Sequence, residues 1–460
     1  MKKLSILLIL ACSFGLVHAQ KQTPPAGGTP KDFKLPDKKQ GELKNGLRSN
    51  LVPYGSVPKV NINLIIKTGN IHEEANQVWL ADLTVQLMKE GTTTMDFKTI
   101  SKKVARMGGD VNINAGMDVV TVSGSVLSEY APDLIKVIGD IVMNPAFPES
   151  ELERLRSDLK RQLSVQKSTP QSQANEKFFS IIYKDHPYGR YFPTEEMLSS
   201  YSITMVKSFY EKNFGAKRSV LYVVGKFDEA AVSKAIEDSF GTWKEGPETN
   251  YPQAIATRSN EIAILDRPNA PQSTIRLGIP TLDPSQPDYQ ALQIANSLLG
   301  GSFGSRITSN IRENKGYTYS PFSSIQSRHR VAVWFEQADV TSEHTGASLQ
   351  EISKEIKRLQ TEPPSKDELE GIQRYEAGVF VRQNSTPAGI IGQLNFIDQH
   401  GLDDGYLTNK VKNIYAVTPE KVSQMTRDYI KYEDMTLVVV GDKKLLEKQI
   451  KAHKDQQKAK

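Results

Sequence analysis

The pattern of apolar and polar positions predicts a chain that mixes strands with helices. Residues 58–67 alternate and then become apolar, as in a half-buried strand, and residues 111–126 predict two strands that turn near Gly116. Apolar positions three and four apart, the helical period, recur in residues 78–89, 129–142 and 149–166. Strands and helices in this mixed order predict an α+β fold, in which a largely antiparallel sheet has helices packed on one face.

An internal repeat links positions that lie 216 residues apart. In each copy an amphipathic helix precedes a buried strand, residues 219–224 in the first and 435–440 in the second. The first copy has Val206, Phe209, Phe214 and Val223-Val224-Gly225, and the second has Val422, Met425, Ile430 and Val439-Val440-Gly441. Pro148 and Pro364 share the offset, and each precedes a predicted helix. A period this long indicates two duplicated domains rather than a solenoid.

The same patterns divide the chain into six segments. We expect a signal peptide at 1–19, a flexible leader at 20–40, an N-terminal domain at 41–245, a linker at 246–258, a C-terminal domain at 259–447 and a polar tail at 448–460. The leader and the linker are rich in Pro and Gly, which favour irregular backbone. The tail is rich in Lys, and we expect it to be the frayed, solvated end of a helix.

The first residues have the order of a secretory signal. Met1-Lys2-Lys3 is basic, residues 4–17 are largely apolar, and Val17-His18-Ala19 fits the small-x-small cleavage pattern. The apolar run is too short to be a good transmembrane span. We therefore expect a secreted protein that is delivered to the periplasm. A lipoprotein anchored through Cys12 is the less favoured alternative, because Leu10-Ala11 fits the lipidation pattern poorly.

Composition excludes several classes of protein. With 24% charged and 38% hydrophobic residues among 460, the chain is typical of a soluble globular protein, and its net charge of +5 gives no support to nucleic-acid binding. Loss of the signal peptide leaves a charge of +3, no cysteine and six histidines. These are His72, His186, His329, His344, His400 and His453. No two of them lie within five residues of each other, so the sequence offers no local histidine pair for a metal.

Several motifs resemble the pitrilysin/insulinase (M16) metallopeptidases. They are Leu43-Lys44-Asn45-Gly46-Leu47, Lys89-Glu90-Gly91-Thr92, Asp185-His186-Pro187-Tyr188-Gly189 and the run from Gly304 to Ser320. The resemblance covers residues 43–442, nearly the whole mature chain. It implies two duplicated M16-type domains that form half of a clamshell.

The zinc motif of the family is absent where the resemblance places it. M16 peptidases carry His-x-x-Glu-His shortly before Gly-Thr, so that two imidazoles on one helical face hold zinc while the Glu polarises its water. The corresponding residues here are Asp82, Val85 and Gln86, and the third family ligand, a Glu, aligns with Gln162. Val85 cannot accept a proton. We therefore expect this chain to bind no zinc. A peptidase with relocated ligands is the alternative, which the scattered histidines disfavour.

A second functional motif of the family is present. In M16 peptidases an Arg and a Tyr seven residues apart contact the substrate carbonyl and stabilise the oxyanion, and Arg312 and Tyr319 have that spacing. We expect residues 307–314 to form a short helix that Gly316 ends, with Tyr319 on the following strand. An Arg that only complements a helix dipole is the alternative. The intact motif around the pair favours the substrate-binding role.

Asn114 and Ala115 resemble the family's edge strand, on which a peptide is bound by strand addition. An ordinary edge strand without a ligand is equally compatible with these residues. Our leading hypothesis is a secreted M16-type subunit that is inactive alone. It would pair with a zinc-bearing homologue and supply Arg312 and Tyr319 for peptide hydrolysis. The alternative is a non-enzymatic peptide-binding or assembly protein on the same fold.

Overall fold

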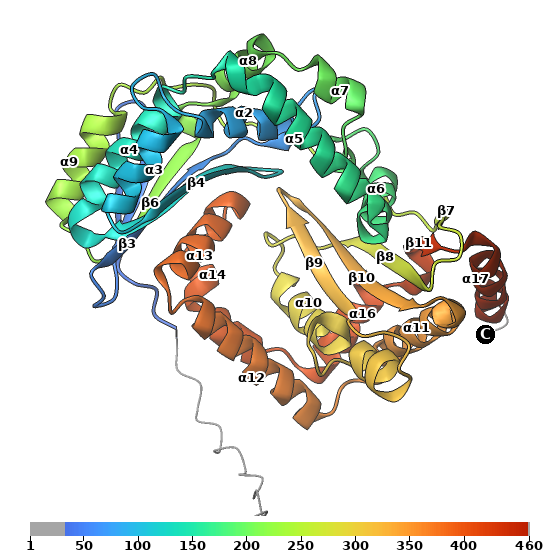
Figure 1. Cartoon of the computed structure of the whole chain (residues 1–460). Helices are drawn as coiled ribbons and strands as arrows, with labels where there is room; N and C mark the ends of the chain where they lie inside the picture. The colour runs from blue at the N-terminus through green and yellow to red at the C-terminus, as the bar shows by residue number, and fades with distance from the viewer. Residues whose placement is uncertain (1–32, 459–460) are drawn as a thin grey trace, which may run out of the picture. The chain divides into compact units, whose positions relative to one another are not determined.

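Two mixed β-sheets organise residues 33–458, the part of the chain that the computed structural model describes (Figure 1). The first sheet has the order β1-β2-β6-β3-β5-β4, with β1 (Lys39–Glu42), β2 (Arg48–Pro53), β3 (Lys59–Ile66), β4 (Asp110–Ala115), β5 (Val120–Leu127) and β6 (Ser219–Gly225). The second has the order β7-β11-β8-β10-β9, with β7 (Ile262–Asp266), β8 (Gln272–Thr281), β9 (Phe322–Arg328), β10 (Val331–Thr341) and β11 (Thr436–Gly441). The predicted signal peptide, Cys12 and the start of the leader lie outside the described residues.

The two sheets share one topology. In the first, β2 runs parallel to β6, and in the second, β7 runs parallel to β11. The other paired strands are antiparallel. Strands β6 and β11 are the ones that the 216-residue repeat relates, and they take the same place in their sheets. The predicted α+β class with two duplicated domains is therefore confirmed.

Helices occupy much of the remaining chain in both halves. Residues up to 245, the first half, contain α2 (Leu80–Lys89), α3 (Phe97–Arg106), α4 (Ala131–Met143), α5 (Glu149–Ser168), α6 (Pro170–Tyr183), α7 (Glu195–Ser200), α8 (Ile203–Asn213) and α9 (Glu229–Phe240), with short 3-10 turns η1 (Asn70–His72), η2 (Ser128–Tyr130), η3 (Pro187–Gly189) and η4 (Ala216–Arg218). Residues from 259, the second half, contain α10 (Tyr289–Asn296), α11 (Thr345–Thr361), α12 (Lys366–Gln383), α13 (Pro387–His400), α14 (Gly405–Thr408), α15 (Lys410–Tyr415), α16 (Pro419–Tyr429) and α17 (Lys443–Lys458). The second half also contains the π-helical segments η5 (Ser297–Gly301) and η6 (Thr308–Asn314) and the 3-10 turns η7 (Ser342–His344) and η8 (Tyr432–Asp434).

One helix from each half packs on the sheet of the other half. Helix α6 of the first half packs on β8 and β11, where Gly278 leaves room for the ring of Phe178 (Figure 1). Helix α13 of the second half packs on β3 and β6, and its Ile391 belongs to the same apolar cluster as Tyr222. Both helices begin in the same way, with a Thr N-cap followed by Pro. We predicted helices on one face of each sheet. The opposite face also carries a helix, because strands β6 and β11 are apolar on both sides.

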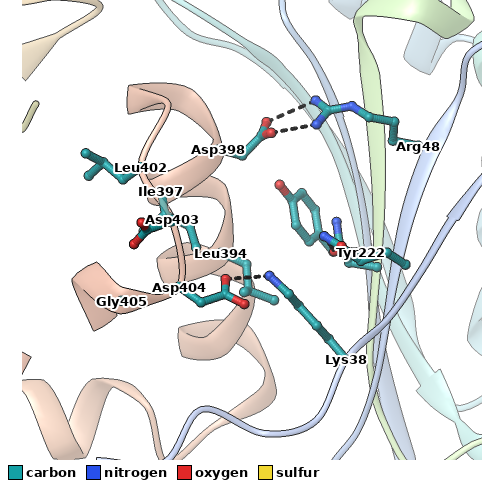
Figure 2. Close-up of a pocket in the computed structure, with 12 residues that line it drawn as sticks. Lys38, Arg48, Tyr222, Leu394, Ile397, Asp398, Leu402, Asp403, Asp404 and Gly405 are labelled. Atoms are coloured by element: carbon teal, nitrogen blue, oxygen red, sulfur yellow. Dashed lines mark hydrogen bonds and ion pairs between the residues drawn. The ribbon is translucent and has the colours of Figure 1, made fainter. Parts of the chain in front are cut away.

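Ion pairs join the two halves beside α13. Figure 2 shows Arg48 and Lys38, from the first half, directed at Asp398 and Asp404. The Arg48 Nη1–Asp398 Oδ1 distance is 2.9 Å, and Lys67 Nζ lies 2.8 Å from Asp398 Oδ2. Burial raises the pKa of Asp398, but Lys67 and Arg48 outweigh it and hold the pKa below its ordinary value.

Two segments near the ends of the described chain pack more than the sequence suggested. The stretch from 448, expected to be the frayed, solvated end of a helix, is the end of α17, in which Ile450 and His453 are buried and the Tyr432 hydroxyl lies 2.8 Å from His453 Nε2. The apolar positions of α17 have helical spacing, so one face of this Lys-rich helix packs. The end of the leader is also packed, because the Phe33 ring lies 4.8 Å from that of Phe380.

The stretch 246–258 contains neither helix nor strand and is held by histidines. His72 Nε2 lies 2.8 Å from the Asn250 carbonyl oxygen, and His186 Nε2 lies 3.2 Å from that of Pro252. Burial lowers the pKa of His72 to about 4, so the ring is neutral at pH 7. His72 and His186 thus have structural roles. In the part of the chain described here, we find no helix with the length and apolar character needed to cross a bilayer.

Candidate functional site

Helix α2 carries the residues that align with the family's zinc motif. The helix begins at Leu80 because Glu73 accepts hydrogen bonds from two backbone N–H groups of the first turn, at 3.0 Å from Trp79 and 2.8 Å from Ala81. Val85, at the position of the general base, is 3% exposed and belongs to the core of the first half. Its side chain contributes to stability and offers no proton acceptor.

The Asp82 carboxylate is already hydrogen-bonded within the first half. Its Oδ2 accepts a hydrogen bond from Asn70 Nδ2 at 2.7 Å, and the same amide donates to Glu73 Oε1 at 3.0 Å. Burial raises the pKa of Asp82 to about 6, although the Asn70 hydrogen bond opposes the shift. Burial, with the Asp82 charge second, raises the pKa of Glu73 to about 8. The two acids and Asn70 form a network that ties η1 to the start of α2.

Gln86 and Gln162 lie on one surface groove, between α2 and α5, and neither Asp82 nor Val85 lines it. Zinc in proteins is bound by thiolate, imidazole or carboxylate. The four aligned positions supply one hydrogen-bonded carboxylate, one apolar side chain and two neutral amides, so these residues do not fit zinc. Among residues 33–458 there is also no group of three or more His, Cys, Asp or Glu placed to hold a metal ion.

The structure brings Arg312 and Tyr319 together at the end of η6. The Arg312 guanidinium carbon lies 5.1 Å from the centroid of the Tyr319 ring, and the Tyr319 side chain is 80% exposed. Gly316, with a positive φ of 65°, ends the helical segment as expected. The helix predicted over residues 307–314 has π-helical hydrogen bonding from Thr308 to Asn314.

The prediction that Tyr319 lies on a strand is wrong. It occupies a bend, and β9 begins only at Phe322. Pro321 stands between them and has no N–H to donate to a neighbouring strand, so regular pairing starts after it. The bend leaves the Tyr319 hydroxyl on the surface rather than in a ladder.

Arg312 retains donors that the described residues do not use. Its Nε lies 3.4 Å from Glu313 Oε1, whereas its terminal amino groups have no hydrogen-bond partner among residues 33–458. A second ring, that of Phe303, lies 4.4 Å from the guanidinium carbon. Our sequence reasoning missed Phe303. The available signal was a bulky apolar residue close to two glycines, Gly301 and Gly304.

Asn114 and Ala115 lie on β4, at the edge of the first sheet. The Gly116 N–H donates to the Val119 carbonyl oxygen at 2.8 Å, which makes the next pair, Ala115 and Val120, a non-hydrogen-bonded one. The backbone N–H and C=O of Ala115 therefore point away from β5, as do those of Ile113 two residues earlier. The Asn114 side chain is exposed. This edge has the unpaired groups that strand addition requires.

Two sequence models of one peptidase family match the chain. The first, "Insulinase (Peptidase family M16)", matches residues 53–193, and the second, "Peptidase M16 inactive domain", matches residues 200–375. Together they span more than half of the 460 residues. The chain belongs to the M16 peptidase family. Its motif-based resemblance to M16 is thus confirmed at the level of the family.

M16 relatives with different names are similar to this chain. It is 26% identical over 332 residues to an "uncharacterized zinc protease" of Rickettsia felis, covering 71% of this chain and 79% of the relative. It is 24% identical over 427 residues to a protein of Bacillus subtilis with the same description, covering 88% and 98%. A "non-peptidase homolog" of Helicobacter pylori is 19% identical over 402 residues, covering 86% and 91%.

Two solved structures share the fold. A Pseudomonas fluorescens structure described as a peptidase M16 inactive domain superposes with a TM-score of 0.81 at 22% identity, covering 88% of this chain and 98% of that one. A chain of complex III2 from Candida albicans superposes with a TM-score of 0.74 at 15% identity, covering 88% and 95%. At these identities the likeness shows the fold alone.

Proposed function

We propose that this chain is an M16 subunit without a zinc site of its own, which completes a peptide-hydrolysing site together with a zinc-bearing homologue. The observation that carries the proposal is a contrast within the chain. Val85, at the position of the catalytic base, is buried in the core, whereas Arg312 and Tyr319 lie together with donor groups unused. Arg312 and Tyr319 can donate hydrogen bonds to a substrate carbonyl, whereas the positions aligned with the zinc motif offer no general base.

Arg312 and Tyr319 can act on the oxygen of the scissile carbonyl. A terminal N–H of Arg312 and the Tyr319 hydroxyl would each donate a hydrogen bond that strengthens as negative charge develops on this oxygen. One such donor typically contributes about 2.7–4 kcal/mol to transition-state stabilisation. The metal and the attacking water would come from the partner subunit, so no step of water activation falls to this chain.

The open edge of β4 would hold the peptide. The outward N–H and C=O groups of Ile113 and Ala115 can pair with an extended backbone, and Asn114 can contact its side chains. Main-chain pairing fixes the direction of the peptide and is tolerant of its sequence. The edge would therefore contribute affinity, while Arg312 and Tyr319 contribute to the rate.

Reconstitution tests the proposal. The chain without residues 1–19 is purified alone and together with a zinc-bearing M16 homologue from the same source, and cleavage of a peptide library is measured with and without a chelator. We expect cleavage only in the mixture, with loss of activity on chelation. Robust zinc-dependent cleavage by the lone chain would overturn the proposal.

Two variants test the residue roles in the mixture. Arg312→Ala and Tyr319→Phe should each lower kcat by about 10²–10³-fold, the loss expected for one oxyanion donor. Matched controls are Arg374→Ala and Tyr375→Phe on α12, two exposed residues in the same half. Unchanged turnover in both site variants would remove the assigned roles.

Export is part of the proposal. The N-terminal residues have the order of a signal peptide, so we propose a periplasmic protein whose partner is exported as well. Cell fractionation of the full chain checks this, and the position of the mature N-terminus distinguishes cleavage after Ala19 from acylation at Cys12. A full-length chain retained in the cytoplasm would contradict it.

A non-enzymatic role on the same fold is the second candidate. It is favoured by the "non-peptidase homolog" of Helicobacter pylori, which covers 86% of this chain. In that case the chain would bind peptides or stabilise an assembly. Co-purification with the homologue without any effect on its hydrolysis would support this role over the first.

A further inference from the structure

Phe303 is among the most exposed large apolar side chains of residues 33–458, at 72%. It lies in the turn between η5 and the helical run that leads into η6, close to Gly301 and next to Gly304. Apart from its two chain neighbours, no described residue has an atom within 4 Å of the position of a Cβ on Gly304, so the turn projects away from the protein there. A phenyl ring left in water loses the stabilisation that burial would give. The guanidinium of Arg312 lies over this ring.

The Arg312 guanidinium is bracketed by two rings. Its carbon lies 4.4 Å from the Phe303 centroid and 5.1 Å from that of Tyr319, and the Arg312 side chain is 22% exposed. Two ring contacts restrict the guanidinium, while the terminal N–H groups along its edge stay available to an acceptor. An arginine without these rings would sample many rotamers before it met a carbonyl oxygen.

The turn that carries Phe303 is anchored from its other side. Arg306 forms a two-pronged pair with Glu368, at 2.7 and 2.9 Å, and the Ser305 hydroxyl donates to Thr308 Oγ1 at 2.9 Å. Ser302 and Arg306 are buried. The backbone on both sides of Phe303 is thus fixed, so the exposed ring keeps its position over Arg312.

We propose that Phe303 is a positioning residue for Arg312 and, with Tyr319, an apolar contact for the peptide. This rests on the proposed function, which it deepens by naming a substrate class. The peptide would carry a large apolar or aromatic side chain next to the carbonyl that Arg312 binds. Both rings stand beside that carbonyl position and have exposed faces.

The positioning part is tested on the lone chain by NMR. Arginine labelled at Nε gives an Hε resonance for each side chain, and that of Arg312 is identified by its loss in Arg312→Lys. Its heteronuclear ¹⁵N NOE reports how restricted the guanidinium is. Phe303→Leu should lower this NOE, because Arg312 then samples more rotamers, whereas Phe303→Tyr should preserve it. An unchanged NOE of the Arg312 resonance in Phe303→Leu would overturn the positioning role.

The substrate part is tested in the reconstituted mixture. Phe303→Leu should lower kcat about two- to fivefold, the effect expected for an exposed cation–π contact, and Phe303→Tyr should restore it. In peptides that differ only beside the scissile carbonyl, the preference of the unmodified chain for Phe or Leu over Gly should shrink in Phe303→Leu. Phe97→Leu on α3, where the side chain is 57% exposed, is the matched control.

The two proposals fail separately. Equal preference in Phe303→Leu and the unmodified chain would overturn the substrate class while leaving the peptidase role intact. A mixture without cleavage would overturn the peptidase role and the substrate class together. In that event the Arg312 resonance still decides whether Phe303 positions the guanidinium.

Discussion

The two halves of the chain use the same scaffold and differ in where their polar groups find partners. In the first half, Asp82 and Glu73 share the amide of Asn70, and Val85 belongs to the hydrophobic core. In the second half, Arg312 and Tyr319 lie on the surface, and Arg312 has unused donors. The acids beside the zinc-motif position are thus partnered within the first half, whereas Arg312 in the second half can donate to a group outside the chain.

This difference shows which parts of a duplicated fold are free to change. The sheet order is fixed by strands that are buried on both faces, such as β6 and β11. The first turns of α2 and the turn after η6 lie at the margin of that framework, so their side chains can be replaced without altering strand pairing. Chemistry can therefore be lost in one half and kept in the other within one architecture.

The exchange of α6 and α13 gives the largest expected effect. Phe178→Ala removes a fully buried ring of the first half that packs on the second sheet, and should cost about 3–5 kcal/mol of unfolding free energy. Urea denaturation measures the loss, and hydrogen exchange should show it in β8 and β11. Phe97→Ala, at an exposed ring, should change stability by less than about 0.5 kcal/mol. Faster hydrogen exchange confined to the first sheet would contradict the packing of α6 on the second sheet.

The ion pairs beside α13 come next. Asp398→Asn leaves Arg48 and Lys67 without their carboxylate and should cost about 1–2 kcal/mol at pH 7, discounted because the Arg48 side chain is 42% exposed. The pKa of Asp398 is depressed in the folded chain, so its contribution is present above the unfolded pKa and lost as pH falls through the folded pKa. Stability curves from pH 2 to 7 should converge at the acid end. A difference in unfolding free energy between Asp398→Asn and the unmodified chain that stays constant across this pH range would argue against the ion pairs.

Glu336, in the second half, contrasts with the buried acids of the first half, Asp82 and Glu73, which are hydrogen-bonded. This β10 side chain is fully buried under Gly300, and neither oxygen has a hydrogen-bond partner among the described residues. Burial raises its pKa well above the usual value, so the stability present at acid pH is lost as pH rises toward the folded pKa. Glu336→Gln should gain on the unmodified chain above about pH 4.3, by at most about 1.4 kcal/mol per pH unit. Parallel melting curves across pH would show that Glu336 is solvated.

Zinc should have the smallest effect. A ligand that binds only the folded state raises Tm, and the residues aligned with the zinc motif do not fit the ion. Micromolar zinc should leave the Tm of the lone chain unchanged, whereas that of the zinc-bearing homologue should rise. A zinc-dependent rise that Asp82→Ala abolishes would place a metal site on α2 and erase the contrast between the halves.

Local sequence patterns predicted much of this structure. They did not predict the features that depend on contacts between segments far apart in the sequence. The apolar runs at 219–224 and 435–440 are buried strands. They could be predicted because a strand buried on both faces has a nearly continuous run of apolar residues. The exchange of α6 and α13 leaves no comparable mark, since it pairs segments far apart in sequence. Tyr319 was assigned to a strand because the effect of Pro321 was overlooked.

The candidate site was only partly predictable. The spacing of Arg312 and Tyr319 and the edge position of Asn114 could be inferred from motifs, and the structure places the first two together and the third on β4. Phe303 could not be inferred, because apolar residues are usually buried and its exposure depends on the fold of the turn. The buried face of α17 could not be inferred, because the many lysines of this helix predict a fully solvent-exposed segment.

The exchanged helices also set the order in which the chain can fold during synthesis. The face of β6 that includes Tyr222 stays uncovered until α13, which ends at His400, has left the ribosome. The first half is therefore made long before its sheet can be closed, and contacts across this distance form slowly. Until then the apolar residues on this face of β6 remain exposed to water.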